Sequence, residues 1–299
     1  MKNNFLKKSI NRVYPLRNLF FYLHRLVLNP RIRRKLANLL AKRLPALPIE
    51  FSNGHQKERG LLENNGYVIL NQFATKEEVA EVLAWLNDKP VYDRWKVAAG
   101  LFPHRSPPAD CHTAPFRDVD IINCPHLLRW ANDPRVLSIV GQTLGCKPTL
   151  SNLTAWWSYP GHDQPQEAEC FHRDVDDFHF VKLFVYLTNV DADCGPHVFV
   201  PGSHRDERLG KIQRYKDSEV TSAFGADGVK YFQGECATAF LENTFGLHKG
   251  QLPKSGPRLL FQAQYSLHPI GIYKYAPIRL TEVPSFALDG YINRLYVKQ

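Results

Sequence analysis

The stretch from Cys170 to Leu187 constrains the chain most, because a possible metal-binding pair leads directly into an apolar strand. It reads CFHRDVDDFHFVKLFVYL. His172 and Asp174 are two residues apart, and side chains at this spacing on a strand point to the same face. If this stretch is a strand, the two side chains could therefore bind one metal ion together. Two ligands do not hold a catalytic metal, so a third is expected downstream.

The composition predicts a large globular protein. The 299 residues can bury a sizeable core, and 44% of them are hydrophobic, which argues against disorder. The six cysteines are well separated and form no CxxC pair. This pattern favours reduced thiols in a cytosolic protein over a disulfide framework or a zinc knuckle, so we expect a cytoplasmic protein.

The positive charge is concentrated in the first 50 residues. Residues 1–50 contain twelve Lys or Arg and one acid, Glu50, whereas the rest of the chain has a net charge of −2. We therefore divide the chain into a basic amphipathic helical arm, residues 1–50, and a nearly neutral domain, residues 51–299.

Two helices are predicted in the arm, with Pro30 between them. The longest apolar run, LFFYL at 19–23, is too short to span a bilayer, and no small-residue cleavage site of a secretory signal follows it. The first apolar stripe comprises Leu16, Leu19, Phe20, Leu23 and Val27, and the second comprises Ile32, Leu36, Leu39 and Leu40.

Three roles of the arm are compatible with this pattern. The helices could pack on the domain, or they could hold the protein peripherally on an anionic membrane surface, such as the inner face of a membrane. An organellar transit peptide fits less well, because Ser9 is the only serine before residue 52. Nucleic acid is not an expected partner, since no recognised binding motif accompanies the charge.

The domain is expected to consist mainly of strands with flanking helices. One helix should follow Thr75, which forms a capping box with Glu78, and another should span Pro134–Leu144 with Gly145 as its C-cap. Strands are predicted near 67–70, 149–159, 180–187, 197–200, 236–242 and 257–267.

Residues 89–125 lack clear periodicity and are rich in Pro, His, Arg and Asp. Long irregular segments inside enzyme domains are often lids or binding loops. Four side chains are therefore candidate substrate contacts, with solvated loop residues as the alternative for each: His104, Arg105, His112 and Arg117.

The third metal ligand is expected at His248, in a turn between two strands. Two histidines and one carboxylate form the facial triad of non-haem Fe(II) oxygenases, which leaves three adjacent coordination positions open. Arg258, on the next strand, could pair with the far carboxylate of 2-oxoglutarate through its planar fork. The rival interpretation is a zinc-dependent hydrolase, but the chain has no obvious HExxH helix and Arg258 would have no role.

From about Gly60 to Leu267 the sequence resembles the phytanoyl-CoA dioxygenase family of Fe(II)- and 2-oxoglutarate-dependent oxygenases. The segments that carry the resemblance are ENNGYVILNQFATKEEV, FHRDVDDFHFVKLFVYL, CGPHVFVPGSH, and TFGLHKG followed by GPR. The resemblance implies a double-stranded β-helix, a cupin-like jelly roll with helices packed on one sheet. It also implies Fe(II) as cofactor, with 2-oxoglutarate and dioxygen as co-substrates.

The resemblance also implies roles for individual residues. His172, Asp174 and His248 match the iron ligands, and Arg258 matches the arginine that pairs with 2-oxoglutarate. Phe178 matches an aromatic residue beside the co-substrate. Candidates for a polar group that assists from the strand before the HxD pattern are Asn152 and Thr154.

Lys182 would face the barrel interior if it shares the strand parity of His172 and Asp174, and it could then bind a carboxylate. An outward-facing lysine after a bulge is the alternative. His197 and His204 are interpreted as structural residues of two turns. The pairs Asp176-Asp177 and Trp156-Trp157 could line the substrate side, with core or solvent positions as the default.

The expected function is hydroxylation of an aliphatic C–H bond. Halogenating relatives replace the carboxylate ligand by a small residue, so an intact Asp174 argues against halogenation. The substrate could be lipid-linked or sugar-containing, such as Kdo-lipid A at a membrane surface, an acyl-CoA, or a small soluble metabolite. A non-catalytic jelly-roll metal-binding protein is the alternative from a different class.

Overall fold

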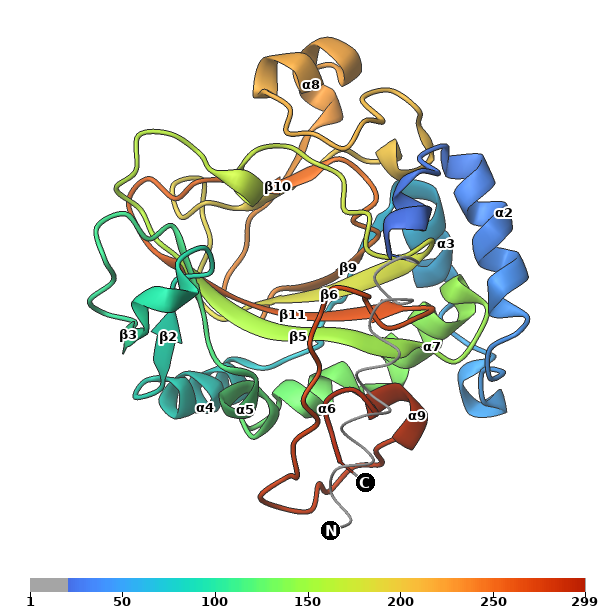
Figure 1. Ribbon diagram of the computed structural model, residues 1–299, viewed down its shortest axis with the longest axis horizontal. Coiled ribbons are helices and arrows are strands. Elements are labelled where there is room, and N and C mark those ends of the chain that lie inside the picture. The colour runs from blue at the N-terminus through green and yellow to red at the C-terminus, as the bar shows by residue number, and fades with distance from the viewer. Residues whose placement is uncertain (1–20, 299) are drawn as a thin grey trace.

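Two antiparallel sheets form the body of the protein, whose computed structural model describes residues 21–298 (Figure 1). The large sheet has the strand order β1-β9-β6-β11-β5-β4, and the small sheet has the order β10-β7-β8. The predicted fold class, a mainly β jelly roll with flanking helices, is confirmed. The large sheet comprises β1 (Tyr67–Ile69), β4 (Thr113–Pro115), β5 (Thr149–Ser158), β6 (Phe180–Tyr186), β9 (Ala239–Glu242) and β11 (Arg258–Ser266). The small sheet comprises β7 (His197–Phe199), β8 (Lys230–Phe232) and β10 (His248–Gly250), and a separate pair comprises β2 (Pro90–Tyr92) and β3 (Leu101–Pro103).

Helices cover the face of the large sheet that is turned away from the small sheet (Figure 1). Trp130 of α6 packs there on Phe261 of β11, with ring centroids 6.0 Å apart. The α-helices are α2 (Pro30–Ala41), α3 (Gln56–Asn65), α4 (Lys76–Leu86), α5 (Asp118–Ile122), α6 (Leu127–Ala131), α7 (Pro134–Leu144), α8 (Asp217–Phe224) and α9 (Gly290–Asn293). Short 3-10 helices are η1 (Ile49–Phe51), η2 (Val97–Ala99), η3 (Glu167–Glu169), η4 (Ser203–Arg205) and η5 (Ala226–Gly228).

Successive side chains of the central strands point alternately to the core under the helices and to the interior between the two sheets. On β11, Leu259 and Phe261 belong to the core under the helices. Arg258, Leu260 and Gln262 line the cavity inside the barrel instead. Since side chains alternate along a strand, one element contributes both core packing and chemistry.

Two helices were predicted correctly from sequence signals at their ends. Thr75 and Glu78 form the predicted capping box of α4. The second helix, α7, has the predicted bounds, and Gly145 adopts the left-handed conformation that favours glycine, with φ of 76°.

Two local expectations about the metal-binding segments were wrong. His248 is not in a turn, because it begins β10 and pairs with Phe199 of β7. The stretch from His172 to Asp174 is not a continuous strand either, since His172 makes only an isolated antiparallel bridge, with His248. Both segments are shaped by pairing with distant residues, which periodicity does not reveal.

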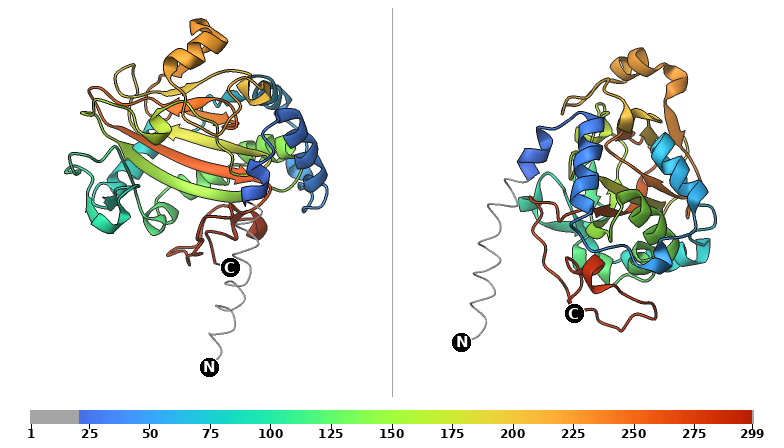
Figure 2. Two further views of the ribbon diagram at one scale, coloured as in Figure 1. Left: turned by 45° about the horizontal axis from the view of Figure 1, so that its top comes forward. Right: turned by 90° about the vertical axis from the view of Figure 1, so that its right-hand side faces the viewer.

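Within the described part of the arm, residues 21–50, helix α2 lies against the body through a different face from the one predicted (Figure 2). Arg33, Ala37 and Ala41 are the buried residues of α2, whereas Ile32 and Leu39 are exposed. Arg33 is accommodated because its guanidinium donates to backbone carbonyl oxygens and lies over two phenylalanine rings. Three residues of the predicted first stripe, Leu16, Leu19 and Phe20, lie outside the described residues, while residues 21–25 are helical and Leu23 is exposed.

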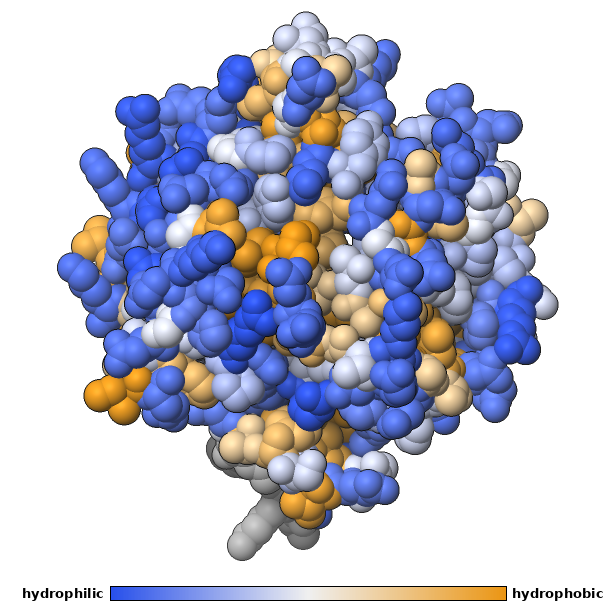
Figure 3. Space-filling model, turned by 180° about the vertical axis from the view of Figure 1, so that it is seen from behind, coloured by the Kyte–Doolittle hydropathy of each residue, from blue (hydrophilic) through white to orange (hydrophobic). Residues whose placement is uncertain are grey.

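No helix within residues 21–298 is long and apolar enough to cross a membrane. The surface seen from behind the view of Figure 1 is largely hydrophilic, with small separate hydrophobic areas (Figure 3).

Arg173 connects the segment between the first two predicted metal ligands to loops that are distant in sequence. Its side chain is buried, and burial lowers its pKa to about 10, so the guanidinium remains charged at neutral pH. It donates to five carbonyl oxygens, at 2.7 Å to Ser203, 2.8 Å to Phe245, 2.9 Å to Arg208, 3.0 Å to Leu209 and 3.1 Å to Asp206.

Replacing Arg173 should therefore loosen the whole region. We expect Arg173→Met to lower the free energy of unfolding by about 3 kcal/mol or more, because several buried carbonyl groups lose their donor. Urea unfolding followed by circular dichroism measures this change. The matched control, Arg279→Met at an exposed position, should change stability by less than about 0.5 kcal/mol. Equal stability of the two variants would contradict the assigned role of Arg173.

Candidate active site

Three side chains that could together hold a metal ion meet at the wall of a cavity of about 650 Å³ between the sheets. Ligand atoms of His172, Asp174 and His248 all lie within 4.8 Å of one another. Nε2 of His172 is 3.5 Å from Oδ1 of Asp174, and Nε2 of His248 is 3.3 Å from Oδ2. The structure thus brings together the three predicted ligands, although His248 is far from the other two in sequence.

Backbone pairing sets the distance between the two histidines. The amide N of each residue donates to the carbonyl oxygen of the other, at 2.9 Å from His172 and 3.0 Å from His248. Their rings lie 4.3 Å apart between centroids. The amide of Asp174 donates to the carbonyl oxygen of Thr244 at 2.9 Å, which ties the carboxylate to the same neighbouring segment.

Both imidazoles are oriented by the same type of hydrogen bond. Nδ1 of His172 lies 2.9 Å from the carbonyl oxygen of Cys170, and Nδ1 of His248 lies 2.9 Å from that of Gly246. A carbonyl oxygen only accepts, so in the neutral rings Nδ1 carries the proton and Nε2 has the free lone pair. Both lone pairs are therefore available on the side of Asp174.

The electrostatics of the site favour a neutral imidazole at His172 and an ionised carboxylate at Asp174. Burial, and secondarily the neighbouring His248, lowers the pKa of His172. Burial alone would raise the pKa of Asp174, but Lys182 and His248 outweigh it and hold that pKa well below its usual value. This set of donors fits a divalent ion such as Fe(II), which accepts imidazole and carboxylate ligands.

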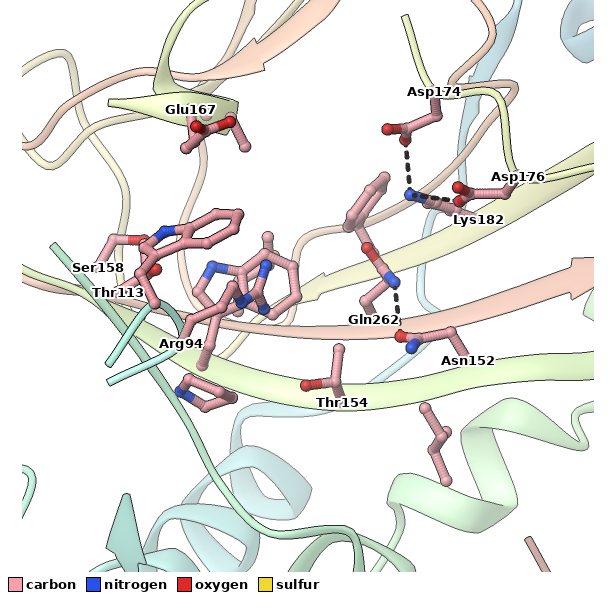
Figure 4. A pocket seen from close by; sticks show the side chains of 18 of the residues that line it. Arg94, Thr113, Asn152, Thr154, Ser158, Glu167, Asp174, Asp176, Lys182 and Gln262 are labelled. Carbon is pink, nitrogen blue, oxygen red and sulfur yellow. Dashed lines mark hydrogen bonds and ion pairs between the residues drawn. The ribbon is translucent and has the colours of Figure 1, made fainter. Parts of the chain in front are cut away.

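Lys182 points into the barrel, and its carboxylate partner is the predicted metal ligand Asp174. Nζ of Lys182 donates to Oδ2 of Asp174 at 2.6 Å and lies 3.8 Å from Oδ2 of Asp176 (Figure 4). The outward-facing alternative is therefore wrong. The bond to Lys182 occupies one carboxylate oxygen of Asp174 and leaves Oδ1 for a metal.

Arg258 lies at the start of β11 and lines the same cavity. Its Nη2 donates to Oγ of Ser158 at 3.2 Å, and its Nη1 donates to the carbonyl oxygen of Gly195. A methyl group at Gly250 would lie 2.9 Å from Nη2, so the small residue makes room for the guanidinium. Within residues 21–298, no carboxylate forms an ion pair with the guanidinium of Arg258. A buried guanidinium in this setting could bind a carboxylate ligand.

The candidate polar residues of β5 face the cavity as well. Asn152 and Thr154 both line it. Oδ1 of Asn152 accepts a hydrogen bond from Nε2 of Gln262 on β11 at 3.0 Å (Figure 4). Gln262 was not identified from the sequence, although its strand parity with Arg258 was a usable signal.

Phe178 does not lie in this cavity, which corrects the expectation that it lies beside the co-substrate. It lines a second cavity near α2, where its ring is 5.5 Å from the guanidinium carbon of Arg33. The chain turns at Asp177, whose carboxylate accepts from the amides of Phe178 and His268, each at 2.7 Å. This turn directs Phe178 away from the metal-binding side chains.

Of the four candidates in residues 89–125, only His112 lines the cavity. It is buried, and its Nδ1 lies 2.8 Å from Oε2 of Glu169. His104 instead stacks on Trp157, Arg105 donates to Asn87, and Arg117 pairs with Asp120. Of the two adjacent pairs that could line the substrate side, each contributes one residue to the cavity. Asp176 and Trp156 line it, whereas Asp177 and Trp157 do not.

His197 and His204, interpreted from the sequence as structural residues of turns, lie in regular elements instead, and His197 also lines the cavity. His197 belongs to β7 and pairs with the fully buried Glu242, with Nε2 2.9 Å from Oε2. Burial raises the pKa of Glu242 to about 8 and holds that of His197 well below its usual value. His204 lies in η4, with Nε2 3.1 Å from the carbonyl oxygen of Glu63.

Arg94 is a further cavity residue that no sequence pattern indicated. Its guanidinium carbon lies 5.2 Å from the ring centroid of Trp156, and the cavity also includes Tyr92 and Tyr273. Burial lowers the pKa of Arg94, while the nearby phenols of Tyr273 and Tyr92 raise it. Arg94 follows the short strand β2 in an irregular segment, and the sequence of such a segment has no hydrophobic periodicity from which the direction of a side chain could be predicted.

Solved structures with the same fold include iron and 2-oxoglutarate enzymes. EctD from S. alaskensis, solved with bound Fe, is 17% identical with a TM-score of 0.51, and the match covers 85% of this chain and 90% of EctD. HygX from Streptomyces hygroscopicus, solved with nickel and 2-oxoglutarate, is 15% identical with a TM-score of 0.50, covering 82% of this chain and all of HygX. At these identities the likeness shows the fold alone. A search of curated protein sequences finds no match.

The family comparison rests on the sequence itself. The family model described as Phytanoyl-CoA dioxygenase (PhyH) matches residues 62–223, which is more than half of the chain. The matched segment contains His172, Asp174 and Lys182, and Fe(II) and 2-oxoglutarate are the cofactor and co-substrate of such enzymes. The chain therefore belongs to the phytanoyl-CoA dioxygenase family and is an Fe(II)- and 2-oxoglutarate-dependent oxygenase.

Proposed function

We propose that this oxygenase hydroxylates an aliphatic C–H bond of an organic substrate bound in the 650 Å³ cavity. The observation that carries the proposal is the group of His172, Asp174 and His248 in one cavity with Arg258. The intact carboxylate of Asp174 supports hydroxylation over halogenation. A zinc hydrolase would leave the buried guanidinium of Arg258 without a role.

In this proposal the protein holds and orients the reactants. His172, His248 and Oδ1 of Asp174 would hold Fe(II), and Arg258 with Ser158 would bind the far carboxylate of 2-oxoglutarate. Bound iron with 2-oxoglutarate supplies the activation of dioxygen and the oxidation of the C–H bond. Lys182 keeps Asp174 in place through its other oxygen, and the carbonyl groups of Cys170 and Gly246 keep the imidazoles in the ligating tautomer.

The triad is tested by anaerobic reconstitution with Fe(II) and 2-oxoglutarate, followed by exposure to dioxygen. Substrate-free succinate formation should fall by about 100-fold or more in His172→Ala and Asp174→Ala, since the metal loses a ligand. Asp227→Ala, at an exposed position, is the control. Succinate formation that is unchanged in both ligand variants would overturn the proposal. Iron binding without any succinate would favour a non-catalytic binding protein, and zinc-dependent ester cleavage without dioxygen would favour the hydrolase.

The position of Arg94 in the cavity supports the proposal that the substrate is anionic. Among the other lysines and arginines that line the cavity, Lys182 pairs with Asp174, Arg258 is proposed to bind the co-substrate, and Lys274 is exposed to solvent. Across residues 21–298, no ion pair of Arg94 with a carboxylate is found, and Figure 4 shows it apart from the Asp174–Lys182 pair. A half-buried cation without an anion gains from pairing, so a negatively charged group of the substrate is its natural partner. Kdo-lipid A and an acyl-CoA both carry such groups, and either remains a proposed substrate.

Arg94→Gln should separate substrate binding from co-substrate binding. With the Fe(II)- and 2-oxoglutarate-loaded enzyme under anaerobic conditions, we expect the variant to bind benzoate about tenfold more weakly, because a charge-assisted hydrogen bond is lost. Binding of neutral benzamide should not change. Arg258→Gln should instead weaken 2-oxoglutarate binding, and calorimetry measures each Kd. A loss of 2-oxoglutarate binding in Arg94→Gln would assign Arg94 to the co-substrate and contradict this role.

Residues 1–50 are proposed to act as a distinct segment that contacts an anionic membrane surface, as their charge suggests. The described part of the arm exposes large apolar side chains beside its basic residues: Tyr22, Leu23, Leu26, Ile32 and Leu39. Apolar side chains among Lys and Arg suit the interface of an anionic bilayer. Because α2 also contributes Ala37 and Ala41 to the main core, point substitutions test this idea better than deletion of the arm.

The double variant Leu26→Ser/Leu39→Ser should bind phosphatidylglycerol vesicles at least about fivefold more weakly than the unmodified protein, because less apolar area enters the interface. Vesicle co-sedimentation at two salt concentrations measures this, and phosphatidylcholine vesicles test the charge requirement. Val283→Ser removes an exposed apolar residue elsewhere and should have no effect. Equal binding of all three proteins would exclude the arm as an anchor.

A further inference from the structure

A second cavity of about 360 Å³ lies beside the arm. It is formed by α2, the end of α3, α7, η4 and the segments around Phe178 and Phe245. None of its lining residues also lines the cavity that contains the metal-binding side chains. Its volume is within the range of small-molecule sites, which is roughly 300–1,000 Å³.

One part of this cavity is apolar. Its lining includes Leu62, Phe178, Phe180 and Phe245. The buried guanidinium of Arg33 lies 4.5 Å from the ring centroid of Phe245 and 5.5 Å from that of Phe178. Nη1 of Arg33 donates to the carbonyl oxygens of His24 and Val27, at 2.8 and 2.9 Å. The guanidinium of Arg33 is therefore used in hydrogen bonds within the protein. The phenylalanine rings around it form a surface suited to an alkyl chain.

The remaining lining is strongly basic. Arg31 and Arg34 are exposed residues of α2, and Arg205 comes from η4. Among the ion pairs found within residues 21–298, none joins these three arginines to a carboxylate; Arg205 donates to the carbonyl oxygen of Asn64 at 2.7 Å. Among the described residues that line this cavity, Glu63 is the one acidic side chain, and it pairs with Arg59 at 3.0 Å.

Two histidines in the lining are neutral at neutral pH. Burial, followed by the nearby charge of Arg34, lowers the pKa of His179 to about 4. Burial also lowers the pKa of His204 to about 4, although its contact with the carbonyl group of Glu63 opposes this. The imidazoles therefore add hydrogen-bonding groups, and the arginines supply the positive charge.

We propose that this second cavity binds a single-chain anionic amphiphile, with its alkyl chain against Phe178, Phe180 and Phe245 and its head group between Arg31, Arg34 and Arg205. Charge complementarity carries the choice of head group, because three arginines that form no ion pair with a carboxylate of residues 21–298 line one cavity with an apolar part. Carboxylate and phosphate monoester share the chemistry that these side chains recognise. The site does not depend on the proposed oxygenase function, since it uses none of the same residues.

The test measures binding of soluble probes to the full-length, Fe(II)-loaded protein by calorimetry, below the micellar concentration of each probe. Decyl phosphate and decanoate should each bind with one equivalent, and the stronger of the two identifies the preferred head group. Neutral decyl maltoside should bind at least about tenfold more weakly, and inorganic phosphate should bind at least about tenfold more weakly because it lacks the chain.

Substitutions of residues that line the second cavity test whether the probe binds there. Arg31→Gln/Arg34→Gln should weaken decyl phosphate binding at least about tenfold, and Thr143→Trp should weaken it by filling the cavity. Arg279→Gln is the matched surface control, and substrate-free succinate formation should be the same in all three variants. Loss of binding in Arg94→Gln or Arg258→Gln would place the probe in the metal-site cavity and overturn the proposal. Equal binding of decyl maltoside, or of inorganic phosphate, would also overturn it.

Discussion

The antiparallel bridge between His172 and His248 is the interaction on which the candidate active site depends. Its two backbone hydrogen bonds, of 2.9 and 3.0 Å, place two imidazoles from distant parts of the chain side by side. Arg173 strengthens the same junction by donating to carbonyl groups of Ser203 and Phe245. The geometry of the ligands is therefore set by backbone pairing, and the side chains need only local hydrogen bonds to be oriented.

The interior of the barrel carries many polar groups, and most of them are paired. Lys182 bonds to Asp174, Gln262 bonds to Asn152, and other buried groups pair in the same way. Pairing lowers the cost of burying such groups between the sheets. Arg258 and Arg94 differ, because no acidic partner is found for either within residues 21–298. Their isolation distinguishes side chains that are available to ligands from those that hold the barrel together.

Elements with strong local signals could be predicted from the sequence. The proline at the start of α7 and the glycine after its end marked its bounds, and Thr75 and Glu78 marked the start of α4. The face of α2 that packs on the body could not be predicted, because Arg33 is buried by carbonyl groups and rings from distant segments. Phe178 was misplaced for a related reason, since the bonds of Asp177 to the amides of Phe178 and His268 turn the chain. Arg94 gave no signal, because it lies in an irregular segment.

The sequence by itself indicated the donor set of the candidate metal site and the class of chemistry, whereas it left the orientation of Lys182 open. The spacing of His172 and Asp174 is a local property, and the remaining ligand and the class of chemistry followed from residue types and from the resemblance of several segments to one family. Only the tertiary structure decided which charges neutralise one another and which remain available. Contacts between segments far apart in the chain decide the partner of Lys182 and the positions of the three arginines around the second cavity. They also leave Arg94 without an ion-pair partner within residues 21–298. Such contacts form when the sheets and α2 pack together, and no local pattern encodes them.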